Sequence, residues 1–220
     1  MNLSFLIALP EMVLLAGTCA LLLVDLRAGG EDRRVTWAMA QCVLLACAAS
    51  TLVVLFGSVT DTAALGDPGS IAVLYGFNRL FVADLMSHVL KLSAYGAVSL
   101  MLVYSRQYLL DRGLLRGEFI SLLLFALLGV MIMASANSFL SLYLGLELLS
   151  LCLYAMVALN RDSTASTEAA MKYFILGALA SGMLLYGMSM IYGATGSLAL
   201  PEIAKQIGQL SKDGTQHAFL

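Results

Sequence analysis

Four charged residues lie inside long apolar stretches of the chain, where charge is costly: Asp84, Lys91, Glu147 and Lys172. A charge at the centre of a bilayer costs roughly 2.5–3.5 kcal/mol on insertion scales. An ion in such surroundings must be paired, hydrated or neutralised, so a residue of this kind is a candidate for function by default. Carboxyl and amine groups offer one chemistry without a cofactor, the binding and release of protons.

Glu147 is the most informative of the four. It lies near the middle of the apolar stretch Ser138–Leu159, too deep for a short carboxylate to reach water. Burial penalises the charged carboxylate, whereas a nearby cation stabilises it. A carboxyl group held between these influences binds and releases a proton. The alternative is a structural glutamate whose hydrogen bonds tie two helices together.

Lys172 is predicted a few residues into the next helix. At about 1.5 Å per residue, its Cα is expected about 9 Å from that of Glu147 along the membrane normal. The lysine stem, or one or two waters, would bridge much of that gap, which makes the two residues a plausible acid–base relay. Two alternatives are a local ion pair with Glu168, four residues earlier, and a side chain extended toward the membrane surface.

Asp84, His88 and Lys91 are spaced to lie on one helical face. They form either a polar stripe toward the bundle interior or a charged helix end near the interface. Lys91 is the deepest of the three and the one we expect to take part in proton translocation. Glu11 follows Pro10 in the first apolar stretch and is expected to be structural, or to face a neighbouring subunit or an aqueous vestibule.

The composition places the chain in a membrane. Of its 220 residues, 60% are hydrophobic and 12% are charged, against about 25% charged in soluble domains, and the mean hydropathy is +0.90. A net charge of −2 gives no basic field that would attract nucleic acid. The four cysteines lie in apolar runs without metal-ligand spacing. No nucleotide-binding, haem-binding or hydrolase motif is present, so we expect no cofactor, metal or redox chemistry in this chain itself.

Six stretches approach the roughly 20 apolar residues that a membrane helix needs. The expected fold is therefore all-α, a single membrane domain over 1–220 with an amphipathic segment at Pro201–Leu220 after the sixth span. The predicted spans are 3–24, 35–56, 81–104, 119–136, 138–159 and 169–192.

Basic residues predict the orientation. Seven arginines fall in the loops on one side of the predicted bundle, whereas Arg79, Lys205 and Lys212 fall on the other. Short cytoplasmic loops are enriched in Lys and Arg, so the N-terminus is predicted to lie outside. The sixth span also holds small residues four apart (Gly177 and Ser181, Ala178 and Gly182), a spacing typical of closely packed membrane helices.

The segment around Glu147 resembles a known family. Ser141–Ala155 (SLYLGLELLSLCLYA) is similar to the fifth helix of the antiporter-like membrane subunits of respiratory complex I. Thr167–Gly182 (TEAAMKYFILGALASG) and Ile191–Ser197 (IYGATGS) resemble the subunit N branch of that family. The first half of the chain resembles it in span pattern and length, with weaker motifs.

This resemblance implies a fold of fourteen helices containing two inverted repeats of five, of which six spans are present here. It matches Glu147 to the family's fifth-helix glutamate and Lys172 to its sixth-helix lysine, positions implicated in proton translocation. The family's principal lysine partner of that glutamate would lie beyond Leu220, so we expect a piece of a longer protein.

The resemblance also implies a setting. NADH, FMN, iron–sulfur clusters and quinone would be used by partner subunits. The chain would contact the neighbouring antiporter-like subunits in a bacterial inner membrane. Three alternatives stay open: a subunit of a multisubunit sodium/proton antiporter, a structural membrane subunit without its own proton path, and a small-molecule transporter, for which no pocket is indicated.

Overall fold

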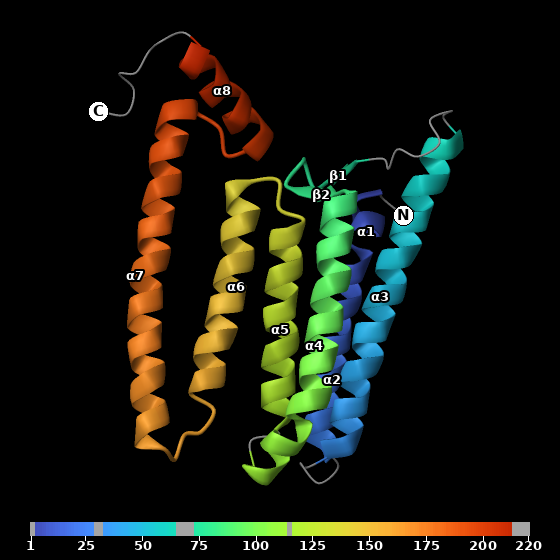
Figure 1. Cartoon of the computed structure of the whole chain (residues 1–220), viewed down its shortest axis with the longest axis vertical. Helices are drawn as coiled ribbons and strands as arrows, with labels where there is room; N and C mark the ends of the chain where they lie inside the picture. Colours follow the sequence, from blue (N-terminus) through green and yellow to red (C-terminus); the bar gives the residue numbers. More distant parts are fainter. Residues whose placement is uncertain (1–2, 29–32, 65–72, 114–115, 213–220) are drawn as a thin grey trace.

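The computed structural model describes residues 3–28, 33–64, 73–113 and 116–212, and most of them form long helices that run alternately up and down (Figure 1). Within these residues, six helices are long and apolar enough to cross a membrane, α2 to α7, which confirms the predicted helical class and number of spans. The elements are α1 (Leu3–Ile7), α2 (Leu9–Ala28), α3 (Arg33–Ala64), β1 (Leu74–Gly76), β2 (Phe81–Ala83), α4 (Leu85–Asp111), α5 (Gly117–Ala134), α6 (Phe139–Val157), α7 (Thr164–Thr195) and α8 (Leu200–Lys212).

Helices α2 to α5 form a four-helix cluster that contains the apolar core. Helices α2 and α4 each pack against α3 and α5, so α2 and α4 face each other diagonally across the middle of the cluster. Helix α6 packs on α5, and α7 packs on α6. Half of the α5 span is buried, against 6% of the α7 span, which makes α5 the central helix. The core includes Leu14, Leu21, Leu44, Tyr95, Leu102, Leu124 and Met131.

The first predicted span is divided near its start. A five-residue helix α1 ends at Ile7, and α2 begins at Leu9. Pro10 fits the first turn of a helix, where its missing N–H is not needed. At about 1.5 Å per residue, the 20 residues of α2 still cross the roughly 30 Å apolar layer of a bilayer.

The third span begins later than Phe81, the predicted start. Phe81–Ala83 form a strand, and Asp84 is the N-cap of α4 rather than a charge within the span. The Ser87 backbone N–H donates to the Asp84 carboxylate at 2.8 Å, and the Asp84 N–H donates to Ser87 Oγ at 3.0 Å. This capping box satisfies backbone donors that a helix start otherwise leaves free. The position of Asp84 is thus explained by local hydrogen bonding.

The β1–β2 hairpin closes over the end of the cluster from which α2, α4 and α6 begin. Its turn holds three non-glycine residues with positive φ, Phe77, Asn78 and Arg79. Contacts from the α5–α6 turn hold it in place: Asn137 Nδ2 donates to Arg79 O at 2.7 Å, and the Val82 N–H donates to Ser135 O at 2.9 Å. The hairpin therefore connects the start of α4 to the start of α6. The turn predicted at 66–69 lies outside the described residues.

Helix α8 occupies part of the segment predicted to be amphipathic. Ile203 is buried, whereas Glu202 and Lys205 are exposed, so the apolar and polar residues lie on different sides of the helix. Residues 213–220 of the predicted segment lie outside the described residues.

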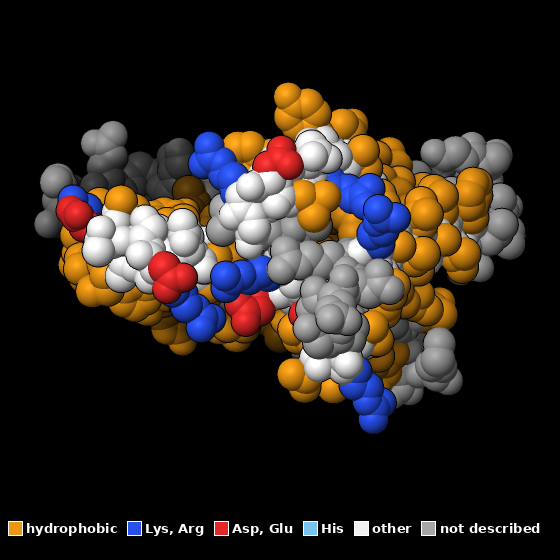
Figure 2. All heavy atoms as spheres, turned by 90° about the horizontal axis from the view of Figure 1, so that it is seen from below, with side chains coloured by type: hydrophobic (Ala, Val, Ile, Leu, Met, Phe, Trp, Pro, Cys, Tyr) orange, Lys and Arg blue, Asp and Glu red, His pale blue; other side chains and the backbone are white. Residues whose placement is uncertain are grey.

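Arginines gather at the end opposite the hairpin. Figure 2 looks at this end and shows basic side chains spread around its rim. The described arginines of the loops and helix ends on this side are Arg27, Arg34, Arg106, Arg112, Arg116 and Arg161. This grouping is the asymmetry from which the sequence predicts the orientation.

Helices α5 and α6 approach each other closely at two glycines. A Cβ added at Gly129 would lie 2.6 Å from Gly145 O, and one added at Gly145 would lie 2.8 Å from Gly129 O. Only glycine permits these backbones to approach so closely. Only one of two α7 glycines makes a close contact in the described structure. Gly177 packs against Tyr154, whereas the Cβ position of Gly182 has no neighbour within 4 Å.

We expect Gly129→Ala to lower the free energy of unfolding by about 1–3 kcal/mol, because the added methyl group must push α5 and α6 apart. Thermal unfolding of the detergent-solubilised protein measures this effect. Gly96→Ala is the matched control, since its Cβ position is open. Equal midpoints for the two variants would contradict the close contact of α5 with α6.

We expect Asp84→Ala to destabilise α4 by about 0.5–2 kcal/mol through loss of the cap. Asp84→Asn keeps a side-chain acceptor and should retain most of that stability. Hydrogen exchange of the first-turn amides of α4 reports the difference. Unchanged exchange in Asp84→Ala would show that the cap does not hold this helix start.

Candidate functional site

Glu147 lies at the middle of α6, as the ninth of 19 residues. Two residues turn a helix by about 200°, so Glu147 points away from the face on which Gly145 touches α5. It shares its face with Tyr154, seven residues later, and the Tyr154 ring meets Tyr173 of α7 at 4.8 Å between centroids. The carboxyl group thus lies on the side of α6 that faces α7.

The Glu147 carboxyl group is incompletely satisfied. Its Oε1 is buried and has no hydrogen-bond partner among the described residues. Tyr143, one turn earlier, interacts with the carboxyl group through its side chain. Buried polar atoms are nearly always hydrogen-bonded. Oε1 is therefore positioned to accept a bond from a donor that the described residues do not supply.

Lys172 is paired locally. Its Nζ lies 2.5 Å from Glu168 Oε1, and both side chains are largely exposed, at 70% and 67%. The neighbouring Tyr173 ring lies against Tyr154, seven residues or about 10 Å along α6 from Glu147. The axial offset is close to the predicted 9 Å, but the lysine points to Glu168 rather than to Glu147. Of the arrangements that the sequence allows, the structure has the local pair.

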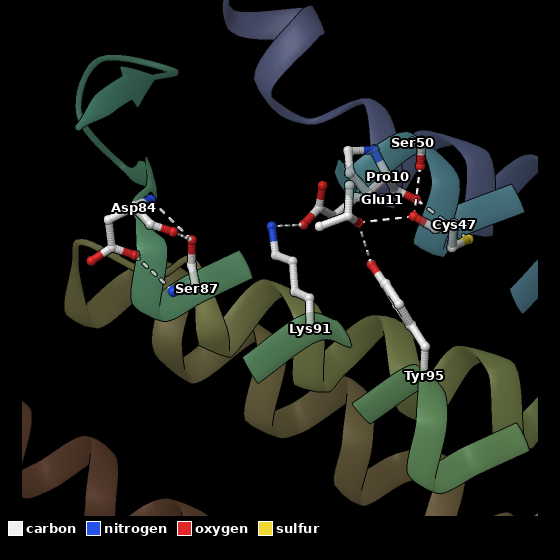
Figure 3. A network of polar contacts seen from close by, with 9 residues as sticks. Pro10, Glu11, Cys47, Ser50, Asp84, Ser87, Lys91 and Tyr95 are labelled. Carbon is white, nitrogen blue, oxygen red and sulfur yellow. Dashed lines mark hydrogen bonds and ion pairs between the residues drawn. The ribbon is translucent and has the colours of Figure 1, made fainter. Parts of the chain in front are cut away.

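Lys91 and Glu11 form a buried ion pair that sequence spacing does not reveal. Lys91 Nζ lies 2.6 Å from Glu11 Oε1, and the two residues are 1% and 8% exposed. Figure 3 shows Lys91 extending from α4 to Glu11 at the start of α2. Of the placements expected for Glu11, the structure has the one inside the bundle, because its carboxylate is buried in the cluster and paired with Lys91.

His88 and Lys91 share the interior face of α4, whereas Asp84 caps the helix. Both are buried, and His88 Nδ1 has no hydrogen-bond partner in the described part of the chain. The Lys91 ammonium also lies over the Phe81 ring, 4.9 Å from its centroid. Of the two arrangements that the sequence left open, His88 and Lys91 have the interior one and Asp84 lies at the helix end. The spacing does not predict the carboxylate that Lys91 contacts.

Metal ligands do not gather in the described residues, where no group of three or more His, Cys, Asp or Glu side chains is placed to hold an ion. The four cysteines are free thiols, and Cys47 and Cys152 are buried.

Comparison with known proteins adds the family. Residues 136–220 match the family model described as "NADH:quinone oxidoreductase/Mrp antiporter, TM". The chain is 52% identical over 200 residues to NADH-quinone oxidoreductase subunit N of Nitrosomonas europaea, covering 91% of this chain and 39% of that protein. It is 54% identical over 197 residues to subunit N of Thiobacillus denitrificans, covering 90% and 38%. The chain spans about two fifths of the length of these relatives.

Solved structures agree with the fold. A chain of respiratory complex I from Thermus thermophilus matches with a TM-score of 0.64 and 30% identity, over 87% of this chain and 38% of that one. A chain of an archaeal membrane-bound sulfane sulfur reductase matches with a TM-score of 0.69 over 90% of this chain and 39% of that one, at 20% identity, which supports the fold alone. Over the part that it spans, about half of the residues of this chain are identical to those of NADH-quinone oxidoreductase subunit N.

Proposed function

We propose that this chain forms part of a membrane subunit of a proton-pumping NADH-quinone oxidoreductase, and that Glu147 lies on its proton path. The observation that carries the proposal is the buried Glu147 Oε1 without a hydrogen-bond partner among the described residues, at the middle of a membrane helix. A carboxyl group in that position changes its proton affinity strongly when a cation approaches or withdraws. The relatives at about 50% identity supply the class of complex.

The electron-transfer chemistry would belong to other subunits, which would use NADH, FMN, iron–sulfur clusters and quinone. Their free energy would reach this chain as a change in the charge or position of groups near Glu147. Moving one charge against about 100 mV costs about 2.3 kcal/mol. A tenfold change in proton affinity corresponds to about 1.4 kcal/mol, so a change of roughly a hundredfold at one buried carboxyl group is sufficient on that scale.

Lys172 is a second proton-carrying residue in this proposal. Its exposed pair with Glu168 places an ammonium group about two helical turns from Glu147. Exchange of Glu168 for another carboxylate or for water would release Lys172 toward the bundle. The chain would lie in a bacterial inner membrane beside the other antiporter-like subunits. Its N-terminus would be outside and its arginine-rich end inside.

One other function has a specific observation in its favour. The matching family model describes Mrp antiporters together with quinone oxidoreductases, so a subunit of a sodium/proton antiporter is the second candidate. A sodium-dependent pH gradient in membrane vesicles without NADH would favour that function. A gradient that requires NADH and quinone would favour the first.

We expect Glu147→Gln, introduced into the complete protein within its assembled complex, to abolish or greatly reduce proton pumping. The amide keeps the size of the side chain but cannot be deprotonated. Pumping is measured in membrane vesicles together with NADH oxidation, and an immunoblot measures assembly. Glu202→Gln is the matched control, because Glu202 is exposed at the start of α8. Normal pumping in an assembled Glu147→Gln complex would exclude Glu147 from the proton path.

We expect Lys172→Met to lower the pumping rate while assembly stays normal, because the exposed pair with Glu168 contributes at most about 1 kcal/mol to stability. Lys205→Met, at an exposed position of α8, controls for the loss of a lysine. Pumping equal to that of the control would leave Lys172 without a role in proton transfer.

A further inference from the structure

We propose that Glu11, Lys91 and His88 form a second buried proton-exchange site, which holds internal water and is separate from Glu147. The residues come from α2 and α4. The proposal goes beyond the function proposed above and does not depend on Glu147, because it concerns a different set of helices.

The placement of Lys91 is the first observation. Its side chain extends from α4 to Glu11 in the first turn of α2 (Figure 3). Taking both ions of a pair out of water is unfavourable, and two apolar side chains of similar size would join the helices at lower cost. A charged pair buried between α2 and α4 therefore points to a role beyond packing.

Unused hydrogen-bonding capacity is the second observation. Lys91 Nζ and Glu11 Oε1 contact each other at 2.6 Å, and neither they nor Glu11 Oε2 and His88 Nδ1 have another hydrogen-bond partner among the described residues. An ammonium group has three donors and a carboxylate has about four lone-pair sites, so one contact leaves most of this capacity unused. These atoms on three buried side chains form a polar site. Buried water typically makes about three hydrogen bonds to groups of this kind, so we assign internal water to the space between them.

The chemistry of the site is a balanced proton transfer. When a proton moves from Lys91 Nζ to Glu11 Oε1, one N–H bond breaks, one O–H bond forms, and the ion pair becomes an amine and a carboxylic acid. Neither form has a net charge. Uptake of one proton from water by the carboxylate leaves the lysine charged and the glutamate neutral. In the tautomer protonated on Nε2, His88 Nδ1 accepts a hydrogen bond from the water that delivers this proton.

The surroundings of the pair indicate from which side of the membrane protons reach it. Toward the hairpin, Nζ lies beneath the Phe81 ring, next to the small apolar cluster of Ile7, Phe81 and Ala83. In the other direction, the Tyr95 hydroxyl lies 3.2 Å from Thr51 Oγ1, and the apolar core follows. The shorter route to water leads past the hairpin, so exchange is expected on that side of the membrane.

The ionisable groups around the pair are few. They are Asp84, His88 and Tyr95 of α4 and Cys47 of α3, whose thiol lies 3.8 Å from Pro10 O. Helix α1 and strand β2 have no charged residue, and the only one of α5, Glu118, is in its first turn at the opposite end. Helix α5 also separates the pair from Glu147, which points away from α5. The pH response of the site is thus determined by its own members.

The test uses infrared difference spectroscopy during pH titration of the assembled complex in liposomes. We expect a carbonyl band of a protonated carboxyl group that shifts in D2O. Glu11→Gln should lose it, and Lys91→Met should change the pH range in which it appears. Glu147→Gln should keep it, which separates failure of this proposal from failure of the function proposed above. Glu118→Gln, at an exposed position, is the matched control and should also keep it.

A variant with one unpaired buried charge is at risk of not assembling. The double variant Glu11→Gln/Lys91→Met removes both charges of the pair together and is expected to assemble. It replaces the single variants in the test if they fail to assemble. Loss of the band in the double variant supports the exchange site. A spectrum identical to that of the wild type, in either Glu11→Gln or the double variant, would overturn the proposal and leave the pair as a lock between α2 and α4.

Discussion

A charge within an apolar bundle is not solvated by water, so it must be stabilised by other protein groups. This constraint explains where the ionisable residues lie. Lys91 is neutralised by Glu11 inside the four-helix cluster, and Lys172 by Glu168 at the exposed side of α7. Asp84 is stabilised at a helix start by the backbone N–H of Ser87. Glu147 is the exception within the described residues, since it has a buried oxygen atom and no opposite charge. The residue that breaks the rule is the one on which the proposed function depends.

The span pattern could be predicted because it depends on one property, the length of apolar sequence. The hairpin could not, because its strands have three residues each, and Phe81–Ala83 read equally well as the start of a membrane helix. That error placed Asp84 inside a span, where its carboxylate suggested function. The helix starts at Leu85 because Asp84 and Ser87 form a capping box. A count of consecutive apolar residues does not detect this local hydrogen bonding.

The site was predictable in position but not in pairing. The depth of Glu147 and the shared face of His88 and Lys91 follow from helical periodicity alone. Lys91 and Glu11 are 80 residues apart in sequence, and their contact depends on the diagonal arrangement of α2 and α4, which no spacing reports. For Lys172, the sequence left two carboxylates open as partners, and the nearer one on the same helix is the one that it contacts.

The two proton sites differ in how complete they are within this chain. The Glu11–Lys91 pair has both of its charges on helices of one well-packed cluster, and the apolar core closes it on one side. Glu147 faces α7, whose span is the most exposed of the six, with 6% buried. The chain covers about two fifths of its relatives' length, and no cation is paired with Glu147 among the described residues. The proton affinity of a pair whose two charges balance is determined by the pair and its immediate neighbours. The proton affinity of a carboxyl group that responds to a cation on another element changes when that element moves the cation. In the proposed function, Glu147 rather than the buried pair is therefore the point at which other parts of an assembly would act on this chain.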